Sequence, residues 1–231
     1  MNYMAIKQEN DRIFQEHEYP EMRSEYFPGA DTDYVNRSAP FRVDDHMQLT
    51  DMISAVLQFR GKHVCALNFA NANVPGGAYT MGGNAQEEAL CRASLLYYTI
   101  RTASEYYTRN RKHTLPDYTN GMIYSSNVPV IRENNGDMLA EPMLCDFITS
   151  PAVNTRVAKL VMSRQKINMT MKNRITQIIA LAANKHPDVL ILGAYGCGAF
   201  GNKRETVYPY FEDAINQYLP EDIEVVFADP H

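Results

Sequence analysis

The chain has 231 residues, which at roughly 100–200 residues per domain corresponds to one domain or at most two. Apolar residues make up 45% of the sequence, enough for a sizeable core, and the net charge of -5 argues against a basic surface that grips nucleic acid. The amino terminus has no apolar signal region and no stretch approaches about 18 apolar residues, so neither an export signal nor a membrane-spanning helix is expected.

The cysteines and histidines show none of the spacings that are typical of metal sites. The four cysteines, Cys65, Cys91, Cys145 and Cys197, form no CxxC motif, and the six histidines form no HxH or HxxxH pair. We therefore predict free thiols, most of them buried, in a reducing cytoplasmic setting, and we expect neither a metal nor another cofactor.

The amino-terminal part differs in composition from the rest. Residues 1–47 are polar, and the pairs Tyr19-Pro20 and Phe27-Pro28 interrupt regular structure. We predict a short helix over residues 7–18 and otherwise irregular chain. The sequence thus divides into an amino-terminal extension, residues 1–47, packed on the body, and a main domain, residues 48–231.

In the main domain, apolar residues recur with a helical period in some segments and form short continuous runs in others. The periodic segments predict helices over residues 49–59, 86–100, 168–184 and 204–218. The apolar runs predict strands over residues 63–69, 144–149, 189–194 and 223–228. Residues 122–131 indicate strand, turn, strand, residues 133–137 a turn, and residues 101–121 a surface loop. Tyr97, Tyr98, Tyr106 and Tyr107 are interpreted as packing or surface aromatics.

Strands that alternate with helices predict a three-layer α/β/α fold with a mixed, largely parallel central sheet. In such sheets ligands bind beyond the carboxyl ends of the strands. Two glycine-rich loops follow predicted strands at that end, and we expect them to face each other across one cleft.

The first glycine loop leads into a pair of acids. The stretch from Pro75 to Glu88 holds two glycine pairs and ends with Glu87 and Glu88 in the first turn of a predicted helix. Glycines let backbone N–H groups approach an anion, and a helix start stabilises negative charge. Taken alone, the glutamates are ordinary first-turn acids, and Asn68 and Asn71 are as readily turn formers as ligand-binding groups. Their combination with the glycine loop indicates a site.

The second glycine loop runs from Gly193 to Asn202. It contains GxGxxG at positions 196, 198 and 201, after a predicted strand and before a predicted helix, a context that suits phosphate binding. A glycine-permitted tight turn is the alternative. A dinucleotide-binding fold is another, with Asp229 as its acid, but too few residues follow for the second half of such a fold.

With these motifs the sequence resembles the microbial-type poly(ADP-ribose) glycohydrolases, enzymes with a macrodomain fold. That family carries three glycines, six to eight residues, and then Gln-Glu-Glu; here Gly76-Gly77-Ala78 is followed after seven residues by Gln86-Glu87-Glu88. Four further blocks are similar to the family: residues 68–71, 124–130, 150–154 and 193–200. The resemblance spans residues 50–228, and the first 45 residues show none.

The resemblance implies cleavage of the glycosidic bond at the distal ribose of an ADP-ribosyl substrate. It implies that Glu88 is the catalytic acid/base, that Glu87 binds the distal ribose hydroxyls, and that Phe200 packs on the ribose. The implied substrate-binding residues are Asn71, Gly76, Gly77, Ala78, Gln86, Gly196, Cys197, Gly198, Ala199, Phe200 and Phe227. The implied partners are ADP-ribose and ADP-ribosylated macromolecules, with no membrane partner.

The sequence departs from the family's pattern at one position of the first glycine loop. Ala78 replaces the third glycine, and its β-carbon would cost about 1–2 kcal/mol if φ were positive there.

The helix dipole favours the charged form of Glu88, whereas Glu87 and a bound diphosphate favour its neutral form. We therefore hypothesise that substrate binding loads the proton onto Glu88.

Three alternative functions remain open at this point. They are a hydrolase of single ADP-ribosyl groups on protein or nucleic acid, a macrodomain that binds ADP-ribose without cleaving it, and an oxidoreductase built on GxGxxG.

Overall fold

The computed structural model describes residues 2–35 and 37–230. A seven-stranded sheet runs through the molecule in the order β1-β4-β5-β3-β6-β7-β2. The strands are β1 Arg23–Phe27, β2 Met47–Gln48, β3 Val64–Phe69, β4 Met122–Arg132, β5 Met138–Ser150, β6 Val189–Gly193 and β7 Glu224–Ala228. The neighbours from β5 to β2 pair in parallel, and β4 and β1 add antiparallel pairings at one edge.

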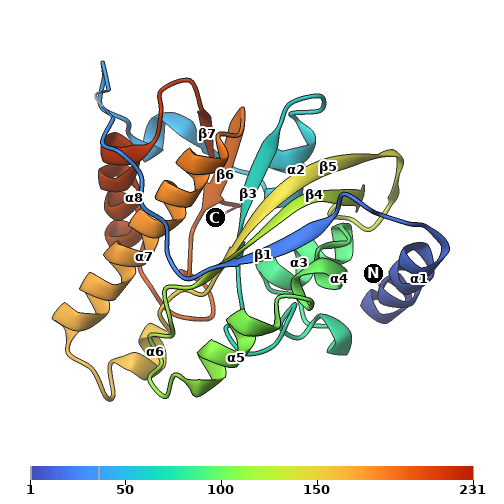
Figure 1. Ribbon diagram of the computed structural model, residues 1–231, viewed down its shortest axis with the longest axis horizontal. Coiled ribbons are helices and arrows are strands. Elements are labelled where there is room, and N and C mark those ends of the chain that lie inside the picture. Colours follow the sequence, from blue (N-terminus) through green and yellow to red (C-terminus); the bar gives the residue numbers. More distant parts are fainter. Residues whose placement is uncertain (1, 36, 231) are drawn as a thin grey trace.

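Helices cover both faces of the sheet (Figure 1). They are α1 Tyr3–Glu16, α2 Met52–Leu57, α3 Gln86–Ala93, α4 Leu96–Ile100, α5 Ser104–Lys112, α6 Thr155–Ala158, α7 Arg164–Lys185 and α8 Arg204–Tyr218. Two short 3-10 helices are η1 Val43–His46 and η2 Tyr79–Met81. One apolar core joins α7 and α8 to the sheet, and a second joins α2, α3, α4 and α5 to its other face. This is the predicted three-layer α/β/α fold with a mixed, largely parallel sheet.

The central strands have apolar side chains on both faces because helices cover both faces. All five residues of β6 are buried, and so are the first five of β3. Because β3, β6 and β7 run parallel, their carboxyl ends meet at one edge of the sheet. Both glycine loops leave the sheet at this edge.

The predicted helix over residues 86–100 is interrupted at Ser94. Its backbone is extended, with φ of -141°, and it forms an isolated bridge with Val130 of β4. The Ser94 hydroxyl donates to the carbonyl of Leu90 at 2.7 Å. Pairing with a neighbouring strand therefore overrides the helical period and divides the segment into α3 and α4.

Two segments predicted to be irregular are regular. Residues 104–112 form α5, whose Tyr106, Tyr107 and Asn110 are buried, so tyrosines supply an apolar face that the polar composition hides. Residues 23–27 form β1, which pairs with β4 from Arg23 opposite Ser126. The division of the chain at residue 47 stays a prediction.

Residues 122–131 were predicted as two strands, but they belong to the single strand β4. The pairing of β4 with β5 shifts register between Ser125 and Val128. Asn127 within this bulge has φ of 55°, a value that asparagine tolerates better than most residues. The turn predicted within residues 122–131 is therefore a β-bulge. Within residues 2–35 and 37–230, no helix is long and apolar enough to cross a membrane.

Candidate active site

The first glycine loop brings the backbone of residues 76–78 against both glutamates. Gly76 and Gly77 have φ of 68° and 56°, values that favour glycine. A β-carbon at Gly77 would lie 2.5 Å from Oε1 of Glu88 and 3.2 Å from Oε2 of Glu87. The absence of a side chain at this position is thus what lets both carboxyl groups occupy their places.

Ala78, which departs from the glycine pattern, has φ of -92°, so its β-carbon causes no left-handed strain. Its N–H donates to Oε1 of Glu88 at 2.8 Å. The space for the methyl group comes from Gly83, where a β-carbon would lie 2.6 Å from that of Ala78. The backbone N–H that the third glycine would provide is therefore retained.

Gln86 fixes the start of α3 to the end of β3. Its side-chain amide donates to the carbonyl of Leu67 at 2.8 Å and accepts from the N–H of Phe69 at 2.9 Å. These bonds give the backbone at the end of β3 hydrogen-bond partners on the side chain of Gln86. Gln86 lines the cavity, and its amide positions the two glutamates that follow it.

Glu87 is 3% exposed and receives two hydrogen bonds. Its Oε2 accepts from the N–H of Asn71 at 2.7 Å, and its Oε1 accepts from the amide of Asn68 at 3.3 Å. Burial raises the pKa of Glu87 to about 8, although the donors from Asn71 and Asn68 act to lower it. Glu87 is therefore largely a neutral acid at pH 7.

Glu88 is 8% exposed and is only half satisfied. Its Oε1 accepts from Ala78, but its Oε2 is buried and has no hydrogen-bond partner within the described residues. Leaving a buried carboxyl oxygen unpaired is costly, and such atoms in native structures often mark functional positions. Glu88 is thus the acid of the pair that has an oxygen without a hydrogen-bond partner among the described residues.

Asn71 has its side chain partly engaged in the local turn. Its Oδ1 accepts from the N–H groups of Asn73 and Val74 at 2.9 and 3.0 Å. The turn-forming alternative thus holds for this oxygen. Asn71 also lines the cavity, so a contact with a ligand through its amide nitrogen stays a prediction.

The second glycine loop offers unpaired backbone donors. Asn202 closes the loop, because its N–H and its side-chain amide both donate to the carbonyl of Gly196 at 3.1 Å. Within the described part of the chain, the N–H groups of Gly198, Ala199 and Phe200 have no acceptor. Consecutive free N–H groups of this kind suit the oxygens of a phosphate.

Both loops line one cavity of about 720 Å³, as predicted from their places at the edge of the sheet. The predicted site residues in its lining are Asn71, Gln86, Glu87, Glu88, Gly196, Cys197, Gly198, Ala199 and Phe200. Gly76, Gly77 and Ala78 lie behind the glutamates instead. A volume of this size is within the usual range for small-ligand sites.

Phe227 lies outside the cavity, contrary to the expectation that it binds substrate. It is fully buried in the core, where its ring packs on Phe211, Tyr208 and Phe41. The last strand alternates its side chains between the two faces of the sheet, and this position faces α8. We therefore leave Phe227 out of the proposed site.

The cavity also contains residues that the sequence did not assign to it. Arg204, the first residue of α8, pairs with Asp229 through two nitrogens, one of them at 2.7 Å, and Tyr208 donates to the same carboxylate. Arg204, Asp229 and Asp51 all line the cavity. The sequence indicated Asp229, from its place at the end of the last predicted strand, only as the acid of the dinucleotide-binding alternative. Among the described residues, no three His, Cys, Asp or Glu side chains gather as a metal site.

The comparisons with known proteins agree with this geometry. The family model for the microbial-type PARG catalytic domain matches residues 2–133, so residues 2–45, in which the sequence alone showed no resemblance, also belong to the family pattern. The structure is similar to that of poly(ADP-ribose) glycohydrolase from Thermomonospora curvata bound to the inhibitor ADP-HPD, with a TM-score of 0.81 and 26% identity over 99% of this chain and 93% of that one. It is also similar to the enzyme from Deinococcus radiodurans in complex with ADP-ribose, with a TM-score of 0.73 and 32% identity over 79% and 74% of the two chains.

No curated protein matches the sequence. The family match nevertheless covers more than half of the 231 residues and includes the first glycine loop and both glutamates. The chain therefore belongs to the family of microbial-type PARG catalytic domains.

Proposed function

We propose that the protein is a glycoside hydrolase that cleaves the ribose–ribose bond of poly(ADP-ribose) and releases ADP-ribose. The observation that carries this proposal is the buried, unpaired Oε2 of Glu88 in a cavity that also contains three free backbone N–H groups. The two relatives named above bind ADP-ribose or ADP-HPD, and a substrate with a diphosphate next to a ribose fits this arrangement of donors and acids.

The free N–H groups of Gly198, Ala199 and Phe200 bind the diphosphate in this proposal. They place the distal ribose towards the start of α3, where Glu87 donates its proton in a hydrogen bond to a ribose hydroxyl. Phe200 packs on the sugar and excludes water from one side. The raised pKa of Glu87 supports its role as a neutral donor at pH 7.

Glu88 performs the acid and base steps. As a carboxylic acid it protonates the glycosidic oxygen, the C–O bond breaks, and positive charge develops on the distal ribose. Its carboxylate then removes a proton from water, and the resulting hydroxide forms the new bond to the anomeric carbon. Glu88 thereby regains its proton, and the products are ADP-ribose and the shortened polymer.

The proton on Glu88 is supplied when substrate binds. Diphosphate brings negative charge into the cavity, and negative charge near a carboxyl group favours its neutral form. Because cleavage starts from the protonated form of Glu88, we therefore expect the alkaline limb, where this proton is lost, to lie at higher pH for kcat than for kcat/KM. Equal values in the two pH profiles would contradict loading by substrate.

The deciding experiment compares Glu88→Gln with Glu16→Gln, an exposed change on α1. Glu88→Gln should release ADP-ribose from polymer at least about 100-fold more slowly, because it lacks the acid. Its affinity for free ADP-ribose, measured by calorimetry, should stay close to that of the wild type, as should both properties of Glu16→Gln.

The substrates separate this proposal from its alternatives. Release from polymer by the wild type supports it. Release only from singly modified protein or nucleic acid would instead indicate a mono-ADP-ribosyl hydrolase, and binding without release a reader. We also propose the cytoplasm as its location, with which four free cysteines are compatible.

A further inference from the structure

The charges of this acidic protein are unevenly distributed along the chain. Between Asp146 and Asp188 the sequence contains seven Lys and Arg residues and no Asp or Glu, although the whole chain carries a net charge of -5. This stretch includes α6 and all of α7. The net charge therefore conceals a local excess of positive charge.

Three of the seven cations have structural partners. Arg174 is fully buried and donates to the carbonyls of Pro151 and Tyr118. Lys172 pairs with Asp213 at 2.7 Å, and Lys185 lies 3.8 Å from Glu25. These three stabilise the fold and leave little charge for a ligand.

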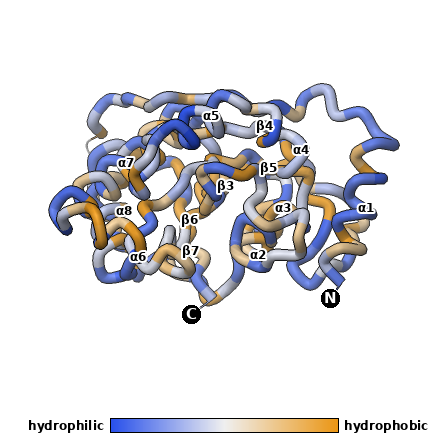
Figure 2. Tube along the Cα trace, turned by 90° about the horizontal axis from the view of Figure 1, so that it is seen from below, coloured by the Kyte–Doolittle hydropathy of each residue, from blue (hydrophilic) through white to orange (hydrophobic). Residues whose placement is uncertain are grey.

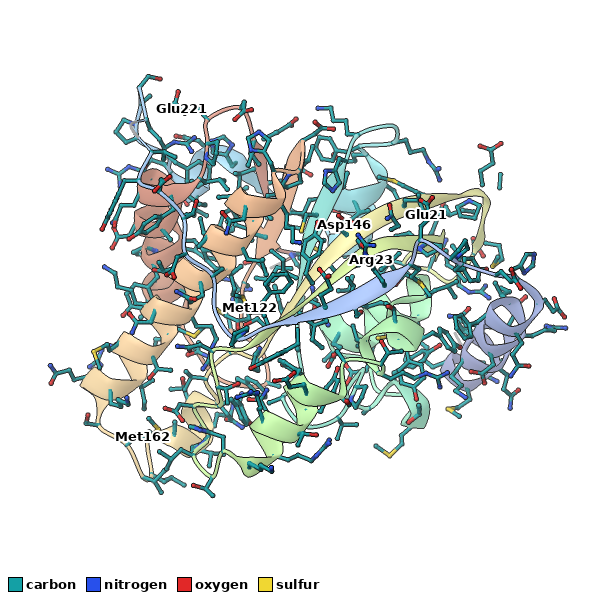
Figure 3. The ribbon with its side chains drawn as sticks, in the orientation of Figure 1. Glu21, Arg23, Met122, Asp146, Met162 and Glu221 are labelled. Carbon is teal, nitrogen blue, oxygen red and sulfur yellow. The ribbon has the colours of Figure 1, made fainter. Side chains whose placement is uncertain are left out.

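The other four cations are exposed and lie close together in the chain. They are Arg156, Lys159, Arg164 and Lys166. We call residues 156–166, which contain these four cations, the α6–α7 segment. Among the described residues none of the four pairs with a carboxylate. Met162 marks the turn of the segment at the periphery of the molecule, on the side where α5 and α6 lie (Figures 1 and 3).

The α6–α7 segment begins at the wall of the cavity. The N–H of Arg156 donates to the carbonyl of Phe200 at 3.2 Å. The side chain of Arg156 also covers Gly201, where a β-carbon would lie 2.8 Å from its Cγ. Because Phe200 lines the cavity that also contains Glu88, the cations start next to this cavity.

Apolar side chains separate the cations. Val157, Leu160 and Val161 are 46%, 75% and 64% exposed, which is unusual for neighbouring large apolar residues on a soluble surface. Figure 2 shows hydrophobic and hydrophilic stretches next to each other at α6. Such a surface is complementary to a chain in which charged groups alternate with flat, weakly polar rings.

We propose that the α6–α7 segment binds the part of the polymer that continues beyond the unit held in the cavity. This inference rests on the proposed function. A polymer whose terminal unit is held in the cavity has its next unit outside it, and Arg156 adjoins the cavity through its contact with Phe200. The diphosphates of the following units contact the four cations, and the adenosines pack on the apolar side chains between them.

The test changes three cations to glutamine: Lys159→Gln, Arg164→Gln and Lys166→Gln together. Arg156 is kept because it packs on the second glycine loop. The matched control removes three exposed cations from outside the α6–α7 segment: Arg12→Gln, Arg23→Gln and Arg60→Gln. Both sets are made in the Glu88→Gln background, so that polymer binding can be measured without cleavage.

The α6–α7 variant should bind long polymer at least about 10-fold more weakly at low salt, since three surface charge contacts are lost. The salt dependence of log affinity should become shallower by about 0.7 for each lost phosphate contact, or about 2 in total. Affinity for single ADP-ribose should not change, and the control variant should match the Glu88→Gln parent in all three measurements.

Three outcomes would overturn the inference. The first is equal polymer affinity in the two variants, and the second is an equal loss of affinity for single ADP-ribose in the α6–α7 variant. The third is binding of the parent to anionic phospholipid vesicles that the α6–α7 variant loses while its polymer affinity is retained, which would assign the segment to a membrane surface.

The same set of proteins separates this inference from the proposed function. If the wild type does not release ADP-ribose from polymer, the proposed function fails and the inference with it. If the wild type cleaves polymer and the α6–α7 changes in an otherwise wild-type chain leave kcat/KM for long chains unaltered, only the inference fails.

Discussion

Glu87 is the residue whose environment differs most from that of an ordinary surface acid. Its carboxyl group is buried, and its pKa is raised from 4.5 to about 8 mainly by burial. Between these pH values the folded protein holds a proton that the unfolded chain has released. The stabilising effect of this proton is complete below about pH 4.5 and is lost as the pH rises through about 8.

We therefore expect Glu87→Gln to make stability less dependent on pH. Glutamine keeps an acceptor for the N–H of Asn71 but cannot ionise. From about pH 6 to pH 8, the free energy of unfolding of the wild type should fall relative to that of the variant, by at most about 1.4 kcal/mol per pH unit. Urea denaturation at several pH values measures this difference. Parallel profiles for the two proteins would contradict a raised pKa at Glu87.

The sequence identified both acids but could not show that their environments differ. Glu87 and Glu88 are adjacent and identical in type, and their helical position predicts stabilised negative charge for both. The partners that distinguish them, Asn68, Asn71 and Ala78, are distant in sequence or act through backbone N–H groups. Only the folded chain shows that Glu87 is satisfied while Glu88 has an unpaired oxygen.

Among the elements, the first glycine loop offers a matched pair of substitutions. Gly77 has a positive φ and no room for a β-carbon next to Glu88, whereas Ala78 has a negative φ and a methyl group already accommodated. The two positions are adjacent, so differences between the substitutions report on conformation and not on location.

Gly77→Ala should reduce the rate of ADP-ribose release by at least about 100-fold, because its β-carbon displaces the catalytic carboxyl groups and misplaced acids lose most of their effect. Ala78→Gly should keep the rate and lower the free energy of unfolding by about 0.4–1 kcal/mol, through the greater freedom of the unfolded chain. Steady-state rates and urea denaturation of both variants test this. A large loss of rate in Ala78→Gly would mean that its methyl group has a role in the site.

The elements themselves were predicted where local pattern and tertiary structure agree. The helix over residues 204–218 has the predicted bounds, and the strand over residues 189–194 is one residue shorter. The local pattern failed where contacts between residues far apart in the sequence determine the structure. Ser94 pairs with β4, and the buried tyrosines of α5 resemble surface residues because the segment around them is polar. Both failures lie next to α3 or on its side of the sheet.

For the whole molecule, the amino-terminal helix connects with the element that bears the glutamates. Asn10 of α1 is fully buried and donates to the carbonyl of Arg92, at the end of α3, at 2.9 Å. Its Oδ1 accepts from Arg132 at 3.0 Å, and Arg132, only 3% exposed, also pairs with Glu9 at 2.7 Å. The first residues of the chain thus satisfy a helix end and a buried charge in the main domain.

Asn10→Ala should lower the free energy of unfolding by about 1–3 kcal/mol, because it leaves a buried carbonyl and a buried guanidinium with fewer partners. Gln8→Ala, an exposed change on the same helix, should have little effect. Urea denaturation measures both. Equal stabilities would show that α1 contributes no more than surface contact to the main domain.

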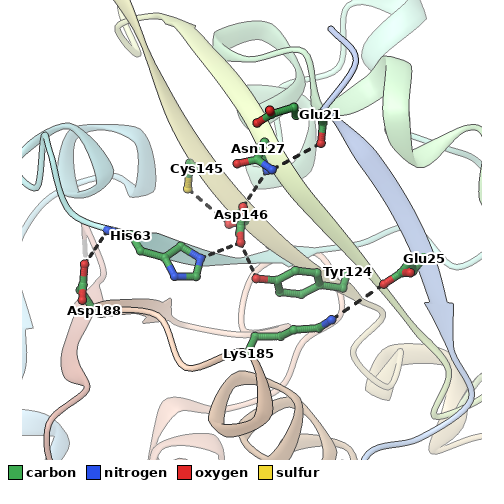
Figure 4. A network of polar contacts seen from close by, with 9 residues as sticks. All are labelled: Glu21, Glu25, His63, Tyr124, Asn127, Cys145, Asp146, Lys185 and Asp188. Carbon is green, nitrogen blue, oxygen red and sulfur yellow. Dashed lines mark hydrogen bonds and ion pairs between the residues drawn. The ribbon is translucent and has the colours of Figure 1, made fainter.

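The two ends of the sheet are built differently. At the carboxyl ends of β3 and β6 lies the cavity with its unpaired groups, whereas the polar groups near the start of β3 are satisfied by one another (Figure 4). There Asp146 of β5, 7% exposed, accepts from His63 at 2.7 Å, from the N–H of Asn127 at 2.7 Å and from the hydroxyl of Tyr124. This network joins β4 and β5 to His63, which directly precedes β3, and fixes the bulge at Asn127.

Asp146→Asn should therefore lower stability without changing the chemistry of the cavity. The amide offers fewer acceptor sites to three donors, so the free energy of unfolding should fall by about 1–3 kcal/mol, while Asp33→Asn on the surface should leave it unaltered. Because the network lies near the start of β3 and the glutamates follow its end, kcat for polymer should match that of the wild type at temperatures where both proteins are folded. A fall in kcat at such temperatures would mean that the bulge and its strands also position α3, and the separation of the two ends would be wrong.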